Sequence, residues 1–362
     1  MAEMDKYFRL MVEHGTSDLH LCTGCKPMFR KDGSIVALKS EDELPAEKVE
    51  QMLFEITPPR NLEEFKTTND TDFAYSLEGY GRYRANIFRD QRGVGGVFRL
   101  IPSKILSFED LKLPPSVKKF CQLPKGLVLV TGPTGSGKST TLAAMIDYIN
   151  KNRTDHIITI EDPIEFVHQN QRCLINQREV HQHTLGFKQA LRAALREDPD
   201  IVLVGEMRDL ETTHIAIETA ETGHLVFGTL HTTTAISTVD RLIDQFPANQ
   251  QQQIRTMLAS ALKGVVAQNL LKKKGGGRVA ALEVLVCNAA VAALIRDAKT
   301  SQIMSIMQTA KKEGMTLLNE ELARFVKDDV IEPMEAYYKA VDKDGLVKSF
   351  ESSGVQFTPP AD

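Results

Sequence analysis

Tryptophan is absent from this chain of 362 residues, and cysteine is scarce, with five in all. So sparse and odd a set does not make the disulfide framework of a small secreted protein. Cys22 and Cys25 form one CxxC pair, but a structural zinc site usually takes its four ligands from two such pairs. A thioredoxin-like pair begins a helix after a strand, whereas this pair lies in a strand–turn–strand stretch. We interpret the two as thiols of a loop.

Long apolar runs and a strong net charge are lacking as well. No apolar run approaches the roughly 18–20 residues that span a bilayer, and residues 1–6 lack the basic-then-apolar order of a signal peptide. Forty-four Lys and Arg against 48 Asp and Glu give a net charge of −4. Such a balance provides no general attraction to nucleic acid or to anionic membranes. These features predict a soluble, cytoplasmic protein.

What remains is the composition of a globular protein with two domains. Hydrophobic residues make up 42% and charged residues 25%, which excludes a largely disordered chain. The length exceeds that of one ordinary domain. Pro102 and Leu113-Pro114-Pro115 bracket a segment that we interpret as a linker. The predicted divisions are an N-terminal domain at 1–101, the linker at 102–115 and a second domain at 116–362.

The first domain is predicted to be a small α+β unit. Met4, Phe8, Met11 and Val12 have the spacing of the apolar stripe of a short helix. Asp32-Gly33 is the turn signal of a hairpin. The other predicted elements are strands at 17–21, 27–29, 35–38, 73–77, 82–88 and 94–101 and a helix at 45–55.

The second domain is predicted to be an α/β unit with a parallel sheet. Continuous apolar runs, separated by helical stretches, indicate strands that are buried on both faces. These runs are 127–130, 157–160, 201–204 and 225–230. A helical stripe follows the first run: Leu142, Met145, Ile146 and Ile149. Beyond a surface turn at 272–277, we predict a strand at 279–286, a helical C-terminal part and a loose tail at 358–362.

A phosphate-binding loop is the firmest motif. Residues 132–139 fit GxxxxGKS/T at every fixed position, between a buried strand and an amphipathic helix. Glycines let backbone N–H groups surround phosphate oxygens, Lys138 reaches the β- and γ-phosphates, and the Ser139 hydroxyl ligates Mg²⁺. The predicted nucleotide contacts are Gly132, Pro133, Thr134, Gly135, Ser136, Gly137, Lys138, Ser139 and Thr140.

Polar clusters follow the other three predicted strands, at 161–165, 205–209 and 231–233. Ligands of an open parallel sheet bind at the carboxyl ends of its strands, so we expect these clusters beside the phosphate loop. Asp200 and His224 instead precede their strands and should lie at the opposite edge.

Phosphoryl transfer to water needs a held Mg²⁺ and a carboxylate that orients or deprotonates the nucleophile. Glu206, at the end of its strand, is the better candidate for the water shell of the metal. Glu165 is the better candidate for the general base, although the two assignments could be exchanged. His231 is either a γ-phosphate sensor or a hydrogen-bonded structural histidine.

Together these motifs resemble the secretion ATPases of type II secretion and type IV pili, over nearly the whole chain. The shared order is the phosphate loop, an Asp box at 160–165, a Walker B segment at 196–209 and a His box at 223–232. Within that family the pilus retraction ATPases are the most similar. Residues 290–297 resemble their AIRNLIRE motif, although Val, Ala and Ala occupy its second to fourth places and Asp297 replaces the final Glu.

The resemblance implies a hexameric ring of chains with an N-terminal PAS-like domain and a RecA-like P-loop core. It also implies that arginines of the N-terminal domain complete an ATP site on the neighbouring subunit. Arg82 and Arg84 share one face of their strand and are the predicted pair. The full set of candidates is Arg82, Arg84, Arg89, Arg92 and Arg99. His224 is also a motif position, for which we expect an interface or packing role.

The function implied is that of an Mg²⁺-dependent ATPase motor for type IV pilus retraction, the motion that drives twitching. ATP hydrolysis would change the angle between the domains, with a hinge in the linker. The motor would act on the inner-membrane platform protein of the pilus. We expect it on the cytoplasmic side of that membrane, bound through its partner only and without nucleic acid.

Three other functions stay open. Pilus assembly and secretion ATPases of the same family typically carry an extra N-terminal domain and a zinc insert with paired CxxC motifs, which we do not find here. A RecA-like nucleic-acid translocase would need a basic pore with stacking aromatics. A nucleotide-binding adaptor without activity would use the carboxylates for structure alone.

Overall fold

The structure is a computed structural model that describes residues 2–31, 34–101 and 104–360. The chain divides into two compact units, Met1–Lys104 and Ile105–Asp362. Residues 105–115 of the predicted linker therefore group with the second unit. The predicted hairpin turn at Asp32-Gly33, the linker boundary at Pro102 and the end of the predicted tail, 361–362, lie outside the described residues.

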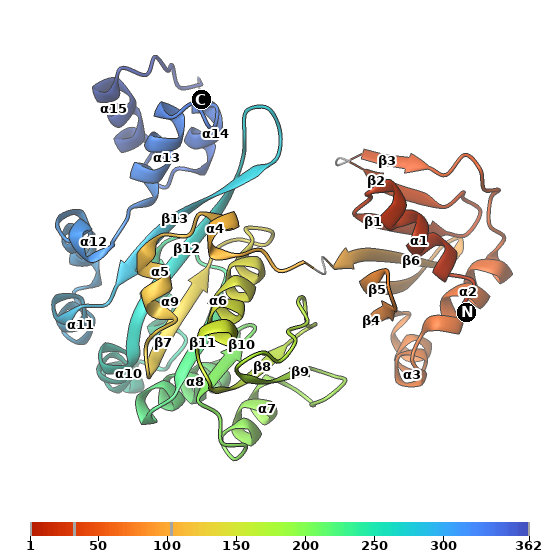
Figure 1. Cartoon of the computed structure of the whole chain (residues 1–362), viewed down its shortest axis with the longest axis horizontal. Coiled ribbons are helices and arrows are strands. Elements are labelled where there is room, and N and C mark those ends of the chain that lie inside the picture. Colours follow the sequence, from red (N-terminus) through yellow and green to blue (C-terminus); the bar gives the residue numbers. More distant parts are fainter. Residues whose placement is uncertain (1, 32–33, 102–103, 361–362) are drawn as a thin grey trace. The chain divides into compact units, whose positions relative to one another are not determined.

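A six-stranded antiparallel sheet forms the first unit, in the order β3-β2-β1-β6-β5-β4 (Figure 1). Its strands are β1 (Asp18–Cys22), β2 (Met28–Lys31), β3 (Ser34–Ala37), β4 (Asp70–Leu77), β5 (Gly81–Asp90) and β6 (Gly93–Ile101). Three helices share one core with this sheet: α1 (Asp5–His14), α2 (Ala46–Ile56) and α3 (Pro59–Thr68). Along β5, Tyr83, Ala85 and Ile87 are buried in that core, so the residues between them belong to the other face.

The elements predicted for this unit from periodicity are confirmed, with two differences. Val12 is 40% exposed, although the helix around it buries Met4, Phe8 and Met11. The sequence analysis also missed α3. Pro58-Pro59 reads as a chain break, but Pro59 occupies the first turn of the helix, where its missing N–H costs no hydrogen bond.

A seven-stranded sheet forms the second unit, in the order β13-β12-β7-β11-β10-β8-β9. All neighbouring strands are parallel except the pair β12–β13. The strands are β7 (Gly126–Thr131), β8 (His156–Glu161), β9 (Leu174–Glu179), β10 (Ile201–Val204), β11 (Leu225–Leu230), β12 (Leu262–Lys272) and β13 (Arg278–Val286). The predicted α/β fold with a parallel sheet is confirmed.

Helices bury both faces of this sheet. Leu127 and Leu129 of β7 belong to one core, with α8 (Leu210–Thr222) and α10 (Ala248–Ala261), while Val128 belongs to another, with α6 (Lys138–Asn152). The four stripe residues predicted for α6 are all buried. The other helices are α4 (Phe108–Leu111), α5 (Pro115–Phe120), α7 (Phe187–Ala194), α9 (Ala235–Asp244), α11 (Ala289–Arg296), α12 (Ile303–Thr309), α13 (Leu318–Lys327), α14 (Pro333–Lys339) and α15 (Lys343–Ser353).

Two strands of the second sheet were not predicted from the sequence. β9 is an edge strand with alternating exposure and lacks the continuous apolar run that marks its neighbours. β12 is almost entirely buried, but Gln268 and Asn269 interrupt its apolar run. The C-terminal helices α13, α14 and α15 pack around Leu271 of β12 and Ala281 of β13, at one end of this long hairpin (Figure 1). Among the described residues, no helix has the length and apolarity needed to cross a membrane.

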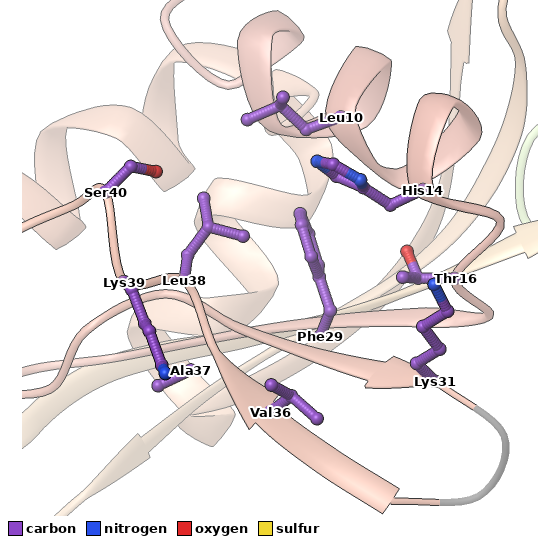
Figure 2. Close-up of a pocket in the computed structure, with 10 residues that line it drawn as sticks. All are labelled: Leu10, His14, Thr16, Phe29, Lys31, Val36, Ala37, Leu38, Lys39 and Ser40. Carbon is purple, nitrogen blue, oxygen red and sulfur yellow. The ribbon is translucent and has the colours of Figure 1, made fainter.

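A cavity of about 400 Å³ lies in the first unit, and its lining residues include none of the phosphate loop. Figure 2 shows the Phe29 ring between His14 of α1 and Leu38, which follows β3. Lys31 and Lys39 also line this cavity. None of the predicted site residues is among its lining residues, so this cavity is not the predicted nucleotide site.

Candidate nucleotide-binding site

The loop between β7 and α6 carries the phosphate-binding motif. Gly132, Gly135 and Gly137 have φ angles of 145°, 77° and 89°, which residues with a Cβ rarely adopt. α6 begins at Lys138, so the positive end of its dipole lies at the loop. The predicted contacts occupy the loop and the first turn of α6: Gly132, Pro133, Thr134, Gly135, Ser136, Gly137, Lys138, Ser139 and Thr140. The conformation suits an anion held by backbone N–H groups.

Gln268 of β12 supports this loop from the side. Its amide nitrogen donates to the Ser136 carbonyl oxygen at 2.7 Å, and its amide oxygen accepts from the Thr141 hydroxyl at 2.7 Å. A Cβ on Gly132 would lie 2.2 Å from the carbonyl oxygen of Gln268, so only glycine fits there. The sequence analysis missed Gln268. The signal that could have found it is a polar pair inside an otherwise apolar run.

Lys138 lies over the loop that precedes it. Its ammonium donates to the carbonyl oxygens of Gly132 at 2.8 Å and Pro133 at 3.2 Å. Desolvation lowers the pKa of Lys138, and the carboxylates of Glu206 and Glu165 oppose that shift. The structure therefore brings both predicted acids within electrostatic reach of the lysine.

Glu206 and His231 meet at the ends of β10 and β11. His231 Nε2 lies 2.6 Å from Glu206 Oε1, and the Arg208 guanidinium contacts the same oxygen. Burial alone would raise the pKa of Glu206, but the hydrogen bonds from Arg208 and His231 outweigh burial and lower it. Glu206 is thus held as an anion, with one oxygen engaged by two partners. Arg208 is the member of this group to which the sequence analysis gave no role.

The loop after β8 carries the predicted base. Glu165 is exposed on this loop, whose neighbouring Ile164 N–H donates to the buried Glu179 carboxylate at 3.0 Å. Glu161, at the end of β8, accepts from the Thr159 hydroxyl at 2.6 Å and from the Gln177 amide at 3.2 Å. Desolvation raises the pKa of Glu161.

A narrow cleft joins the end of β8 to α6. Its lining includes Ser139, Glu161 and Gly205 but neither Glu165 nor Glu206. His168 also lines it, and burial lowers the pKa of this histidine to about 4, so the imidazole is neutral at neutral pH. Glu161 therefore lies closer to the predicted metal ligand Ser139 than the sequence could indicate.

Three predicted polar positions have contacts of their own. Asp209 caps α8, accepting from the Thr212 N–H at 2.8 Å. Asp200 precedes β10 and accepts from the His156 N–H at 2.8 Å. His224 precedes β11, with Nδ1 3.2 Å from the Thr219 carbonyl oxygen, at the opposite end of the strand from His231.

The candidate arginines lie on the antiparallel sheet of the first unit. Arg82 and Arg84 alternate with buried Tyr83 on β5, so they share one face as predicted. Arg99 of β6 pairs directly with Arg84 across the two strands, and its Nε donates to Asp18 Oδ1 at 2.7 Å. The role of Arg82 and Arg84 at the ATP site of a neighbour stays a prediction.

The segment that resembles the retraction motif forms α11. Asn288 caps this helix, its side chain accepting from the Val291 N–H at 3.0 Å. Val291 and Ile295 are buried, whereas the Arg296 side chain is 56% exposed and contacts Asp297. The departures from the motif therefore leave an amphipathic helix with a charged C-terminal end.

Comparisons with known proteins agree with this geometry. The model of the family described as "Type II/IV secretion system protein" matches residues 97–336. The chain is 50% identical over 328 residues to "Type IV pilus retractation ATPase PilT" of Pseudomonas aeruginosa, covering 91% of this chain and 95% of that protein. It is also 50% identical to "Twitching motility protein" of Neisseria gonorrhoeae, over 89% of this chain and 86% of that protein.

A solved structure of similar fold is the "Crystal Structure of the Pilus Retraction Motor PilT and Bound ADP". It has a TM-score of 0.90 and 44% identity, and the match covers 96% of this chain and 99% of that one. The chain belongs to the type II/IV secretion system protein family. The sequence-based resemblance to a P-loop ATPase of that family, and within it to the pilus retraction ATPases, is confirmed.

Proposed function

We propose that this member of the type II/IV secretion system protein family is the Mg²⁺-dependent ATPase motor of type IV pilus retraction. The observation that carries the proposal is the 50% identity to a pilus retraction ATPase over 91% of the chain. The meeting of Lys138, Glu206 and His231 beside the phosphate loop supplies a chemical basis for it.

Phosphate binding is the first task of the site. The glycines at 132, 135 and 137 let backbone N–H groups surround phosphate oxygens. The Ser136 hydroxyl is buried with no hydrogen-bond partner among the described residues, so a phosphate oxygen would satisfy it. Lys138 would exchange its two loop carbonyls for the β- and γ-phosphates, whose negative charge also favours the ionised lysine that burial disfavours.

Oxygen donors for Mg²⁺ are available beside the loop. The described residues hold no group of three or more His, Cys, Asp or Glu side chains that could bind a metal ion. Mg²⁺, however, usually takes substrate phosphates, waters and one or two protein oxygens. The Ser139 hydroxyl and the ionised Glu206 carboxylate, which would act through water, fit that requirement. When bound, the ion neutralises charge on the transferred phosphoryl group.

A carboxylate has to orient or deprotonate the attacking water. We assign that task to Glu165, whose exposed position on the loop after β8 leaves it reachable, and keep the exchange with Glu206 as the alternative. His231 holds Glu206 through Nε2 and would report the state of the γ-phosphate to β11 through that contact. Arg82 and Arg84 of a neighbouring subunit would add positive charge as the transition state forms.

Six such chains would form a closed ring through heterologous contacts. For hydrolysis to do work, ATP and ADP must favour different arrangements of the two units. A nucleotide that binds both arrangements with equal affinity does not shift the equilibrium between them. The ring would pass this movement to the platform protein of the pilus at the inner membrane. The membrane location would then come from that partner, with the motor on the cytoplasmic face.

The deciding experiment is deletion of the gene in its host followed by complementation, with twitching and surface pili scored together. A retraction motor predicts cells that do not twitch and carry excess pili, restored by the wild-type gene and not by a Lys138→Ala copy. Bald cells would instead indicate an assembly ATPase of the family. Normal twitching and piliation would contradict a pilus role and leave the translocase and adaptor alternatives.

A further inference from the structure

Cys22 and Cys25 occupy the two ends of one tight turn after β1. The Cys25 N–H donates to the Cys22 carbonyl oxygen at 3.1 Å. Gly24 has φ of +71°, as the third position of a type II β-turn requires. The CxxC pair therefore takes the first and fourth positions of a hydrogen-bonded turn, which the sequence did not reveal.

Such a turn brings two cysteines to the separation of a disulfide. The Cα atoms at its ends lie within about 7 Å, and disulfides join Cα atoms roughly 4.4–6.8 Å apart. Contacts on both sides fix the turn. On one side, the Gly24 N–H donates to the Leu44 carbonyl oxygen at 2.8 Å, and the Leu44 N–H donates to the Cys25 carbonyl oxygen at 3.0 Å. On the other side, the Thr23 hydroxyl donates to the Val94 carbonyl oxygen at 3.0 Å. These contacts hold the backbone of the turn in place around the two cysteines.

Arg92 distinguishes Cys25 from the other cysteines. Its Nη1 donates to the Cys25 sulfur at 3.3 Å, and its own backbone N–H is held by Asp90 Oδ1 at 2.7 Å. This contact places a cation directly against the Cys25 sulfur, next to the second thiol of the pair. Burial raises the pKa of Cys22, and it raises the pKa of Cys121 and of Cys287 to about 12, so the last two thiols stay protonated at neutral pH.

We propose that Cys22 and Cys25 form a reversible disulfide, which makes this turn a site of redox modification. The Cys25 thiolate attacks a low-molecular-weight disulfide such as oxidised glutathione, forming a mixed disulfide and releasing one glutathione thiolate. The deprotonated Cys22 then attacks the Cys25 sulfur and releases the second. One protein dithiol is oxidised and one glutathione disulfide is reduced to two thiols.

The reaction also changes the contact of Arg92. A disulfide sulfur is a poor hydrogen-bond acceptor, so the guanidinium loses its sulfur partner when the ring closes. The loop closed by this disulfide is very short, so the bond gains little from chain entropy, and it stays open to reduction. Arg92 is one of the arginines considered for the ATP site of a neighbour. That consequence rests on the proposed function, whereas the disulfide itself does not.

The test uses the full-length protein, reduced, freed of reductant and equilibrated in glutathione buffers of increasing oxidised fraction. Free thiols are trapped with N-ethylmaleimide, and the mass of the peptide that contains both cysteines is measured by mass spectrometry. We expect two of the five thiols to disappear together, with a peptide two hydrogens lighter and full reversal by dithiothreitol. Cys22→Ser should instead accumulate the glutathione adduct at Cys25, while Cys287→Ser should behave as wild type.

A second measurement tests the arginine. In the Cys22→Ser background, Arg92→Ala should slow alkylation of Cys25 at neutral pH by roughly three- to tenfold, because the Cys25 sulfur loses the guanidinium that contacts it. Arg89→Ala, a change in the same strand region with no contact to Cys25, should leave that rate unchanged. The proposal is overturned if Cys22 and Cys25 stay reduced or carry only separate glutathione adducts. An inactive ATPase that still forms the disulfide would contradict the proposed function alone.

Discussion

The two sheets of this protein differ in how many faces they bury. β5 of the antiparallel sheet buries Tyr83, Ala85 and Ile87 on one side and carries Arg82 and Arg84 on the other. β7 of the parallel sheet buries Leu127 to Val130 without alternation. A sheet covered on one face can place charges along the middle of its strands, whereas the inner strands of a sheet covered on both faces carry them mainly at their ends. The chemistry of each unit follows this difference.

The largest expected effect is the loss of folding stability caused by a cavity in the parallel sheet, which helices cover on both faces. Phe227→Ala removes a fully buried ring from β11 and should cost roughly 3–5 kcal/mol of folding free energy. Arg84→Ala, on the open face of β5, should cost less than about 0.5 kcal/mol. Chemical denaturation of the full chain, followed by far-UV circular dichroism, compares the two. Equal losses would contradict the contrast between the sheets.

The next effect concerns the strand end at which Glu206 lies. Glu206→Ala removes the acid that contacts His231 and Arg208, and steady-state ATPase turnover should fall roughly 10²- to 10³-fold. Glu165→Ala should give a loss of similar order if it is the base. Glu221→Gln, an exposed change at the other end of the same unit, is the matched control. Unchanged turnover in both Glu206→Ala and Glu165→Ala would refute the mechanism.

A smaller effect is expected from the open face of the first sheet. Arg82→Ala and Arg84→Ala should each lower ATPase turnover at least about tenfold. This loss is smaller than the roughly 10³-fold loss expected when one arginine alone stabilises the transition state, because here two arginines share that role. Folding stability should hardly change. If neither variant alters turnover, the role passes to Arg89, Arg92 or Arg99, and mixing with Lys138→Ala subunits would then show which of these acts on a neighbour.

The smallest effect concerns a polar residue inside the doubly covered sheet. Gln268→Ala leaves the Ser136 carbonyl and the Thr141 hydroxyl without their partner, and ATP affinity should fall about tenfold as the loop loosens. Titration of a fluorescent nucleotide measures the Kd. Asn269→Ala, the neighbouring buried position on the same strand, is the control. Equal Kd values for all three proteins would mean that the loop needs no support from β12.

Local patterns predicted a large part of the fold and the core of the site. The apolar runs of β7, β8, β10 and β11 and the stripe of α6 are signals carried by neighbouring residues. In the phosphate-loop motif, the glycines at 132, 135 and 137 predict the positive φ angles that the backbone adopts there. Because parallel strands end at a common edge, the motif order also predicted that Glu206 and His231 lie at the same edge of the sheet as Lys138.

Contacts between distant segments could not be predicted in the same way. Gln268 supports a loop more than a hundred residues earlier, and no local pattern encodes which strand lies beside β7. Arg208 and His231 share one oxygen of Glu206 only because β10 and β11 are neighbours. The Arg92 contact with Cys25 likewise needs β1 beside β6. Sequence alone thus determined most of the elements and the phosphate loop. The tertiary structure decided which polar groups meet, because hydrogen bonds and burial depend on position in space.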